Sequence, residues 1–536
     1  MLSYRKLAMR VLGHPLHTGG IDSPRPASQR AAAFVLTAAM LTTLAAPAFA
    51  DIWHIENGDI TISAGESGNN VTQNNNTTYG DTNTIITNQN KDTASSHTVT
   101  IEAKDKDDKV EVTLKDVNID TSSRNKAAVS VTGEGDTNIK LDGDNALKSD
   151  IYRSGIYGSG SGSLTISGGE NDSLTAQGGS GANGISSSGS LTISGGTVTA
   201  NGDDGGRGIS SSGSVTISGG STVTANGGSG TISGGDGIWS GGGVTISGGS
   251  TVTANGGNGG SLVGGDGIRS GGGLTVSDGT VTAKGGNGDS KDGYGGDGIR
   301  SGGVVTISGN TVNAAGGYGG KVGGYGICSF DRVAISGGTV EAAGGNGSTG
   351  GGSGIYSSVI DLSGSLELTA KAGSPNGRAL SQNGSELKLD DIKDKLGPGA
   401  KVTATDANGE TKQVSIPRPV EPEESSSSSD GGSAAPSAPA SPLPGLTVTD
   451  KDGQRISYTS TQSGNTLTVC VGRLTASFRI SLAALRQLRA EGIETITFQT
   501  ILCSTTLSVD ELLAMGGEDA EAVLTHRFTD SSLTVG

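Results

Sequence analysis

The sequence predicts an all-β chain dominated by a right-handed, single-stranded parallel β-helix. One unit recurs through its centre, for example GGDGIRSGGGLTVSDGTVTAKGG at 264–286 and GGDGIRSGGVVTISGNTVNAAGG at 295–317. An Ile after a recurrent Gly marks each copy, and successive markers lie 24 to 31 residues apart. A period of this length is typical of a solenoid in which each copy forms one coil. The markers are Ile156, Ile185, Ile209, Ile238, Ile268, Ile299, Ile327 and Ile355.

Each copy holds three short segments in which apolar and polar residues alternate. In one of them Val244 and Ile246 alternate with Thr245 and Ser247. Period-two alternation with β-branched residues predicts half-buried strands. Gly-Gly and Ser-Gly pairs separate the segments and permit sharp corners. The copies differ in length mainly in the Gly-rich segment before the marker, which we expect to be a loop.

Stacked coils would bring equivalent residues together at about 4.8 Å, the spacing of neighbouring strands. An inward apolar column would then run along the interior, and each such side chain contributes roughly 1.5–3 kcal/mol on burial. The predicted column is Ile166, Ile193, Ile217, Ile246, Val276, Ile307, Ile335 and Leu362.

The sequence divides into five regions. They are an export signal at 1–50, an N-terminal cap with irregular first coils at 51–150, Gly-rich β-helix repeats at 151–415, a linker at 416–445 and a small α+β domain at 446–536. In the irregular part we expect strands at 59–63, 84–87, 98–102, 110–114, 129–131 and 138–141. The stack should finish with strands at 364–370, 386–389 and 401–405.

The first region has the features of a secretory signal peptide. A basic leader precedes an apolar run at 31–46, and Ala48-Phe49-Ala50 resembles a cleavage site. The run is too short for a convincing membrane anchor, so no membrane insertion is expected. Removal of this leader would change the net charge from −16 to about −20. Such an acidic chain is not expected to bind nucleic acid.

The three cysteines of the chain predict neither a metal site nor a network of disulfides. The chain has Cys328, Cys470 and Cys503, without a CxxC pair or a neighbouring His, so a zinc site is not supported. Cys470 and Cys503 share the C-terminal domain, and either a disulfide between them or two reduced thiols fits the sequence.

The linker is rich in Pro, Ser and acidic residues, which predicts an extended, disordered spacer. In the domain that follows, Ser481 and Ser508 each have the spacing of a helix N-cap. Its role is open: it could attach the protein to the cell surface or be inert. The strands expected there are 446–449, 455–459, 467–471, 476–480, 495–499, 523–528 and 533–535.

Stacking also predicts columns of polar residues on the outside of the rod. Two residues before the marker, three successive copies carry Asp236, Asp266 and Asp297, at a spacing where like charges repel. Arg269 and Arg300 would neutralise them in an exposed salt-bridge ladder, or Ca²⁺ would bind them as carboxylate ligands. Both interpretations remain open at this point.

The same face carries side chains suited to a glycan. Aromatic rings stack on sugar C–H groups, and Arg pairs with uronate carboxylates through two parallel hydrogen bonds. The predicted carbohydrate-binding residues are Trp239, Arg269, Arg300, Tyr325 and Tyr356.

Three strings upstream of the repeats carry a family resemblance: TVTIEAKDKDDKVEVTLKDVNID at 98–120, AAVSVTG at 127–133 and TNIKLDGDNALKS at 137–149. Together with the repeated SLTISGG and GI units, they resemble the clostridial secreted proteins with a polygalacturonate-binding parallel β-helix domain. The resemblance covers roughly 51–405. It implies export to the surface of a Gram-positive bacterium, bound Ca²⁺ and an acidic pectic polysaccharide as partner, but it assigns no calcium ligand to a residue here.

Two other function classes remain. A calcium-dependent polysaccharide lyase would need a metal and an Arg base, for which Asp266, Asp297 and Arg300 are the candidates. Asp203-Asp204 resembles the acidic pair of a hydrolase, but the repeats contain no His and their short loops cannot build a deep cleft, so we expect a solvated turn there and no enzyme. The third class is a structural surface fibre or adhesin that binds protein partners.

Overall fold

A computed structural model describes residues 51–417, 445–450, 455–456, 458–463, 465–471, 475–500, 504–515, 520–526 and 531–535. The predicted signal peptide, nearly all of the predicted linker and Cys503 lie outside these residues. The contacts of the chain separate into two compact units, with the division between Glu421 and Pro422. Each unit is described by itself.

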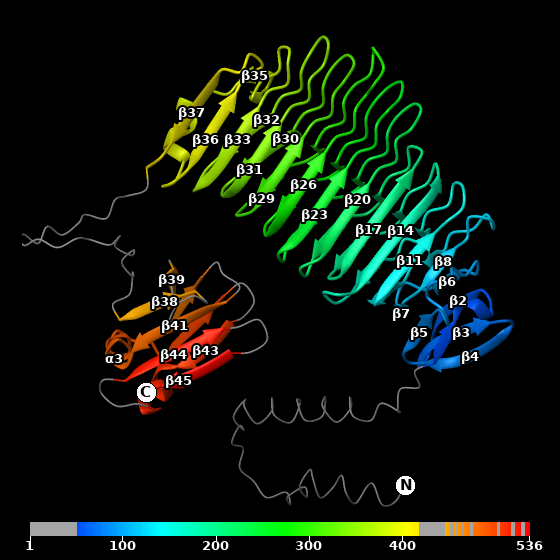
Figure 1. Cartoon of the computed structure of the whole chain (residues 1–536), viewed down its shortest axis with the longest axis horizontal. Coiled ribbons are helices and arrows are strands. Elements are labelled where there is room, and N and C mark those ends of the chain that lie inside the picture. The colour runs from blue at the N-terminus through cyan, green and yellow to red at the C-terminus, as the bar shows by residue number, and fades with distance from the viewer. Residues whose placement is uncertain are drawn as a thin grey trace, which may run out of the picture. The chain divides into compact units, whose positions relative to one another are not determined.

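The first unit is a parallel β-helix with three strands in each regular coil, so the predicted fold class is confirmed (Figure 1). Each strand pairs in parallel with its equivalent in the next coil, which forms three sheets along the rod. The first sheet carries the marker Ile residues. Its strands are β2 (Ile60–Gly65), β6 (Val99–Ala103), β9 (Val129–Gly133), β12 (Ile156–Gly158), β15 (Ile185–Ser187), β18 (Ile209–Ser211), β21 (Ile238–Ser240), β24 (Ile268–Ser270), β27 (Ile299–Ser301), the first halves of β30 (Ile327–Ile335) and β32 (Ile355–Leu362), and β34 (Leu380–Gln382).

The second sheet follows after a short corner, and β30 and β32 run through this corner into it. Its remaining strands are β1 (Ile52–His54), β5 (Thr84–Thr87), β7 (Lys109–Lys115), β10 (Asp136–Asp142), β13 (Leu164–Ser167), β16 (Leu191–Ser194), β19 (Val215–Ser218), β22 (Val244–Ile246), β25 (Leu274–Val276) and β28 (Val305–Ile307).

The third sheet completes each coil before the Gly-rich segment. Its strands are β8 (Asn118–Asp120), β11 (Asp144–Lys148), β14 (Ser173–Ser180), β17 (Thr197–Asp203), β20 (Thr222–Asn226), β23 (Ser250–Asn255), β26 (Gly279–Lys284), β29 (Thr311–Ala315), β31 (Gly338–Ala343), β33 (Leu366–Lys371) and β36 (Lys401–Thr405).

The interior is the predicted stack of aliphatic side chains. Ile246 pairs with Ile217 in one neighbouring coil and with Val276 in the other, and all three side chains are fully buried. The marker residues Ile238 and Ile268 are paired and buried in the same way. The apolar residues that alternate with polar ones in the sequence therefore form one continuous core, because every coil places them at the same inward positions.

Antiparallel strands close both ends of the stack. At the N-terminal end β2 pairs with β3 (Gly68–Gln73), which pairs with β4 (Asn76–Asp81), and a 3₁₀ turn, η1 (Ile55–Asn57), lies beside them. At the other end β36 pairs with β37 (Thr411–Ser415). Only the first strand of the N-terminal group was predicted. The strand expected at 386–389 is wrong, because β35 (Ser385–Glu386) ends early and η2 (Leu389–Lys395) follows it.

The Gly-rich segments are loops, as predicted, and backbone hydrogen bonds stack them from coil to coil. Each leaves the third sheet, turns and returns to the corner before the marker, and the segments stack along the rod as a glycine layer (residues 227–235, 256–265, 285–296, 316–324 and 344–352) (Figure 1). The N–H of Gly257 donates to the Gly235 carbonyl, and the N–H of Gly265 donates to the Gly257 carbonyl, both at 2.8 Å. A Cβ at Gly265 would lie 1.9 Å from the Gly235 oxygen. Close backbone contact therefore requires glycine here.

The described residues of the second unit form one antiparallel sheet, one mixed sheet and two helices. Ser481 caps α3 (Leu482–Ala490) by accepting the Ala484 N–H, and the Ser508 hydroxyl accepts the Glu511 N–H in α4 (Val509–Met515), so both predicted caps are confirmed. The strand expected at 455–459 is wrong, since Arg455 makes only an isolated bridge. The strands are β38 (Leu446–Thr449), β39 (Thr459–Ser463), β40 (Thr466–Cys470), β41 (Ala476–Ser481), β42 (Thr495–Gln499), β43 (Ser504–Ser508), β44 (Glu521–His526) and β45 (Ser531–Val535).

Within the described residues, no helix has the length and apolar character needed to cross a bilayer.

Candidate functional site

The predicted binding residues lie together along the first sheet and the corner before it. Pairing in register places Trp239 beside Arg269, Arg269 beside Arg300, Arg300 beside Cys328 and Cys328 beside Tyr356. The sequence period therefore predicted the neighbours in this column. Tyr325 lies two residues before the marker Ile327, at the position that Asp297 has in the preceding coil. Cys328 follows the same marker, so both residues belong to one coil.

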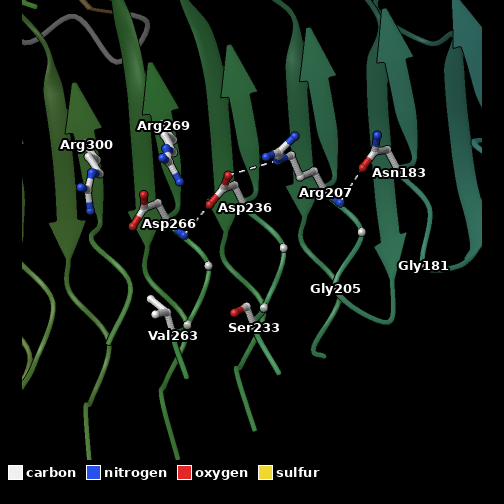
Figure 2. A pocket seen from close by; sticks show the side chains of 15 residues that line it. Gly181, Asn183, Gly205, Arg207, Ser233, Asp236, Val263, Asp266, Arg269 and Arg300 are labelled. Carbon is white, nitrogen blue, oxygen red and sulfur yellow. Dashed lines mark hydrogen bonds and ion pairs between the residues drawn. The ribbon is translucent and has the colours of Figure 1, made fainter. Parts of the chain in front are cut away.

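A groove of about 510 Å³ lies between the glycine layer and the side chains of Arg269 and Arg300 in this column, whereas Trp239, Tyr325 and Tyr356 do not line it (Figure 2). Its walls come from successive coils, so it crosses the strands instead of following one of them. Ser233 and Val263 line it from the glycine layer, and the other side chains belong to the corner and the first sheet. Those side chains are Asn183, Arg207, Asp236, Asp266, Arg269 and Arg300.

The acidic column is not an exposed ladder, which corrects that interpretation. Asp236, Asp266 and Asp297 are each only 5–6% exposed. Each carboxylate accepts the backbone N–H of the equivalent residue in the next coil, at 2.9 Å from Asp266, 2.7 Å from Asp297 and 2.7 Å from Tyr325. These side chains point along the rod and join coil to coil, so their main contacts are with the backbone.

Arginine neutralises two of the three carboxylates. Arg207 Nε lies 3.2 Å from Asp236 Oδ2, and Arg300 Nη1 lies 3.7 Å from Asp297 Oδ2. Arg269 makes no ion pair within the described part of the chain. Burial, followed by the charges of Asp297 and Asp236, raises the pKa of Asp266, and burial also raises the pKa of Asp297. The floor of the groove is therefore a buried acidic column, and its rim carries guanidinium groups.

The three aspartates do not fit a calcium centre made from protein oxygens alone. One oxygen of each carboxylate already accepts a backbone N–H, and an arginine faces the second oxygen of Asp236 and of Asp297. The described residues hold no group of three His, Cys, Asp or Glu side chains arranged to bind a metal. Calcium binding by these residues stays a prediction.

Aromatic rings extend the site on either side of the arginines. The Arg207 guanidinium lies over the Trp239 ring, 4.4 Å from its centroid, and the rings of Tyr325 and Tyr356 are stacked at 4.9 Å and 18°. Arg300 lies 5.3 Å from the ring of Phe330, which is 56% exposed.

Sequence reasoning missed Arg207 and Phe330 as site residues. Arg207 stands in the acidic column, two residues before its marker, and its charge in that column was the available signal. Phe330 lies in β30, which continues from the first sheet into the second without the corner that other coils have. Nothing in the repeat pattern predicted that this corner would be absent.

The acidic pair Asp203-Asp204 lies outside the groove lined by the arginines. Both side chains are exposed, and the Asp204 N–H donates to the Asp203 carboxylate within a turn. This placement agrees with the predicted solvated turn.

Comparison of the chain with known protein families, curated protein sequences and solved structures found no match. The fold itself is consistent with proteins that bind polysaccharide and with proteins that act on it.

Proposed function

We propose that the groove beside the glycine layer binds an acidic polysaccharide outside the cell without cleaving it. One observation carries this proposal: the guanidinium groups of Arg207, Arg269 and Arg300 lie over three successive coils. Arg207 belongs to the coil before, but its stacking on Trp239 places its charge over the next coil.

The chemistry of these groups favours carboxylated sugars. A guanidinium group presents a planar fork of donors that matches a carboxylate, and it remains charged at all physiological pH values. Arg207 covers one face of the neighbouring Trp239 ring and Tyr325 covers one face of Tyr356, so sugar C–H groups would stack on the opposite faces. The overall charge of −16 makes a local row of arginines more distinctive, because anions are repelled elsewhere. The sequence resemblance to pectin-binding proteins makes polygalacturonate the first ligand to test.

Cleavage of the polysaccharide is the second candidate. Asp266 lines the groove, and its raised pKa is a property that general acids share. Against this role, its carboxylate accepts the Asp297 N–H and is held along the rod, away from a ligand above the groove. We therefore favour binding.

Affinity electrophoresis of the full chain in gels containing polygalacturonate tests the proposal. We expect retention by the unchanged protein and about tenfold weaker binding for Arg269→Ala, since a hydrogen-bonded charge pair contributes about 1.5–3 kcal/mol. Arg332→Ala is the matched control, because Arg332 is an exposed arginine of β30 outside the groove.

Each outcome separates the candidate functions. Retention without new reducing ends or unsaturated products supports binding, whereas such products would establish an enzyme. No retention on polygalacturonate or on other acidic glycans would reject the proposal and favour a structural fibre. Parallel gels with Ca²⁺ and with EDTA test the predicted calcium assistance: loss of retention in EDTA would support a bridging ion, and unchanged retention would assign binding to the arginines alone.

A further inference from the structure

A second cavity continues the groove toward the N-terminal end of the rod. It has a volume of about 220 Å³ and is lined by Tyr152, Arg153, Tyr157 and Ser186, together with Gly181 and Asn183. The larger cavity is also lined by Gly181 and Asn183. The two cavities therefore adjoin, and together they form one elongated groove.

The combined groove crosses six consecutive coils of the described β-helix. In the column after each marker, Tyr157 pairs with Ser186, Ser186 with Ser210, Ser210 with Trp239, Trp239 with Arg269 and Arg269 with Arg300. Neighbouring coils are about 4.8 Å apart, so the groove runs parallel to the axis of the rod. One sugar unit of a linear polysaccharide spans about the same distance as one coil.

Accepting the proposed function, we infer that a linear glycan lies along the axis with one sugar over each coil, so that six sugars fill the groove. The three guanidinium groups occupy successive coils at one end, and the 44%-exposed ring of Tyr157 lies at the other. Charges at three successive coils match a polymer that carries a carboxylate on every sugar. A polymer with a carboxylate on every second sugar would leave at least one arginine of the row without a partner.

A series of oligogalacturonates from one to eight sugars, titrated calorimetrically into the full chain, tests this arrangement. We expect Kd to fall by at least about tenfold from the trimer to the hexamer and to stay constant from the hexamer to the octamer. Hyaluronate oligosaccharides of equal length, with a carboxylate on every second sugar, should bind more weakly. A Kd that is already constant from the dimer onward would overturn the axial arrangement while leaving the proposed function intact. Failure of every oligomer and of the polymer to bind would reject the proposed function itself.

Substitutions at the two ends of the combined groove test independently whether the glycan lies along the axis of the rod. Tyr157→Ala should weaken the hexamer to about the affinity of the pentamer and leave trimer binding unchanged, because Tyr157 lies at the sixth position and the trimer occupies the arginine end. Arg300→Ala should weaken both ligands. The control is Tyr79→Ala, which removes a 77%-exposed ring of the N-terminal hairpin and should change neither. Equal loss of trimer and hexamer binding in Tyr157→Ala would contradict a glycan that lies along the axis.

Discussion

The carboxylate of Asp266 accepts the backbone N–H of Asp297 at 2.7 Å, so that a side chain of one coil holds the main chain of the next. Asp236 and Asp297 make the same contact with their following coils. Asn183, in the same column, accepts the Arg207 N–H at 2.8 Å with its amide oxygen (Figure 2). A negative charge is therefore not required for this hydrogen bond, and the buried charges of the aspartates are expected to cost stability.

The first prediction is a fall in stability with rising pH that depends on Asp266. Burial raises the pKa of Asp266 from 3.8 to about 8. Between these values the folded state keeps a proton that the unfolded state releases, so the free energy of unfolding decreases as pH rises through this range. Asp266→Asn should keep the hydrogen bond to Asp297 and remove the part of the decrease that Asp266 causes, which gives a gain of about 1 kcal/mol or more at pH 8.

Thermal unfolding of both proteins from pH 5 to pH 8 measures this difference. Asp278→Asn is the control, because Asp278 is an exposed aspartate outside the acidic column. Parallel pH profiles for Asp266→Asn and the unchanged protein would show that Asp266 does not titrate in this range.

The second prediction concerns the glycine layer. Gly265→Ala places a Cβ 1.9 Å from the Gly235 carbonyl oxygen, and this backbone atom cannot move without breaking the hydrogen bonds between coils. We expect a loss of about 2–3 kcal/mol in the free energy of unfolding, typical of an overpacked site. Gly350→Ala is the matched control in the same layer, because its Cβ would meet only the Val322 methyl groups at 3.8 Å.

Chemical denaturation of the two variants provides the comparison. Equal stability of Gly265→Ala and Gly350→Ala would mean that the segments are loosely packed. In that case the close backbone contacts would not contribute to the fold.

The parts that sequence predicted well are those that depend only on the repeat. Ile246 and Ile268 are buried and Trp239 lies beside Arg269, because a constant register converts spacing along the chain into neighbours in space. The stacking of the glycine layer was missed because Gly-Gly pairs were interpreted only as sharp corners and loops. The pairs recur with a three-residue period, as Gly256-Gly257 and Gly259-Gly260, and this regularity was the available signal.

The burial of the aspartates could not be predicted from spacing. A column position defines the coil and the corner, but whether a side chain points to solvent or along the rod depends on the backbone angles of that corner. If the Asp236 side chain pointed to solvent, it would be an exposed ion. Because it points along the rod, it accepts the Asp266 N–H instead. Arg207 became part of the site for the same reason, since its side chain leans over the next coil.

The third prediction is a strong dependence of glycan binding on salt and on free carboxylates. Salt screens exposed charges, so the affinity for polygalacturonate should fall at least about tenfold between about 0.05 and 0.5 M salt. Arg269→Ala should show a weaker dependence on salt, because it has lost one of the three charges of the row. Fully methyl-esterified pectin, which lacks these carboxylates, should not bind. Salt-independent binding, or equal binding of the ester, would show that aromatic stacking dominates instead.

The last prediction uses the two tryptophans of the chain as reporters. Trp239 lies in the site beneath the Arg207 guanidinium, whereas the Trp53 indole N–H donates to Asp81 in the N-terminal cap. A glycan over this coil would change the surroundings of Trp239 alone. Titration with polygalacturonate should therefore change tryptophan fluorescence in Trp53→Phe and leave it unchanged in Trp239→Phe. Arg207→Ala should shift Trp239 emission to longer wavelength before any ligand is added, because its ring becomes more exposed to water. A ligand-induced change that persists in Trp239→Phe would place the glycan on another surface of the rod.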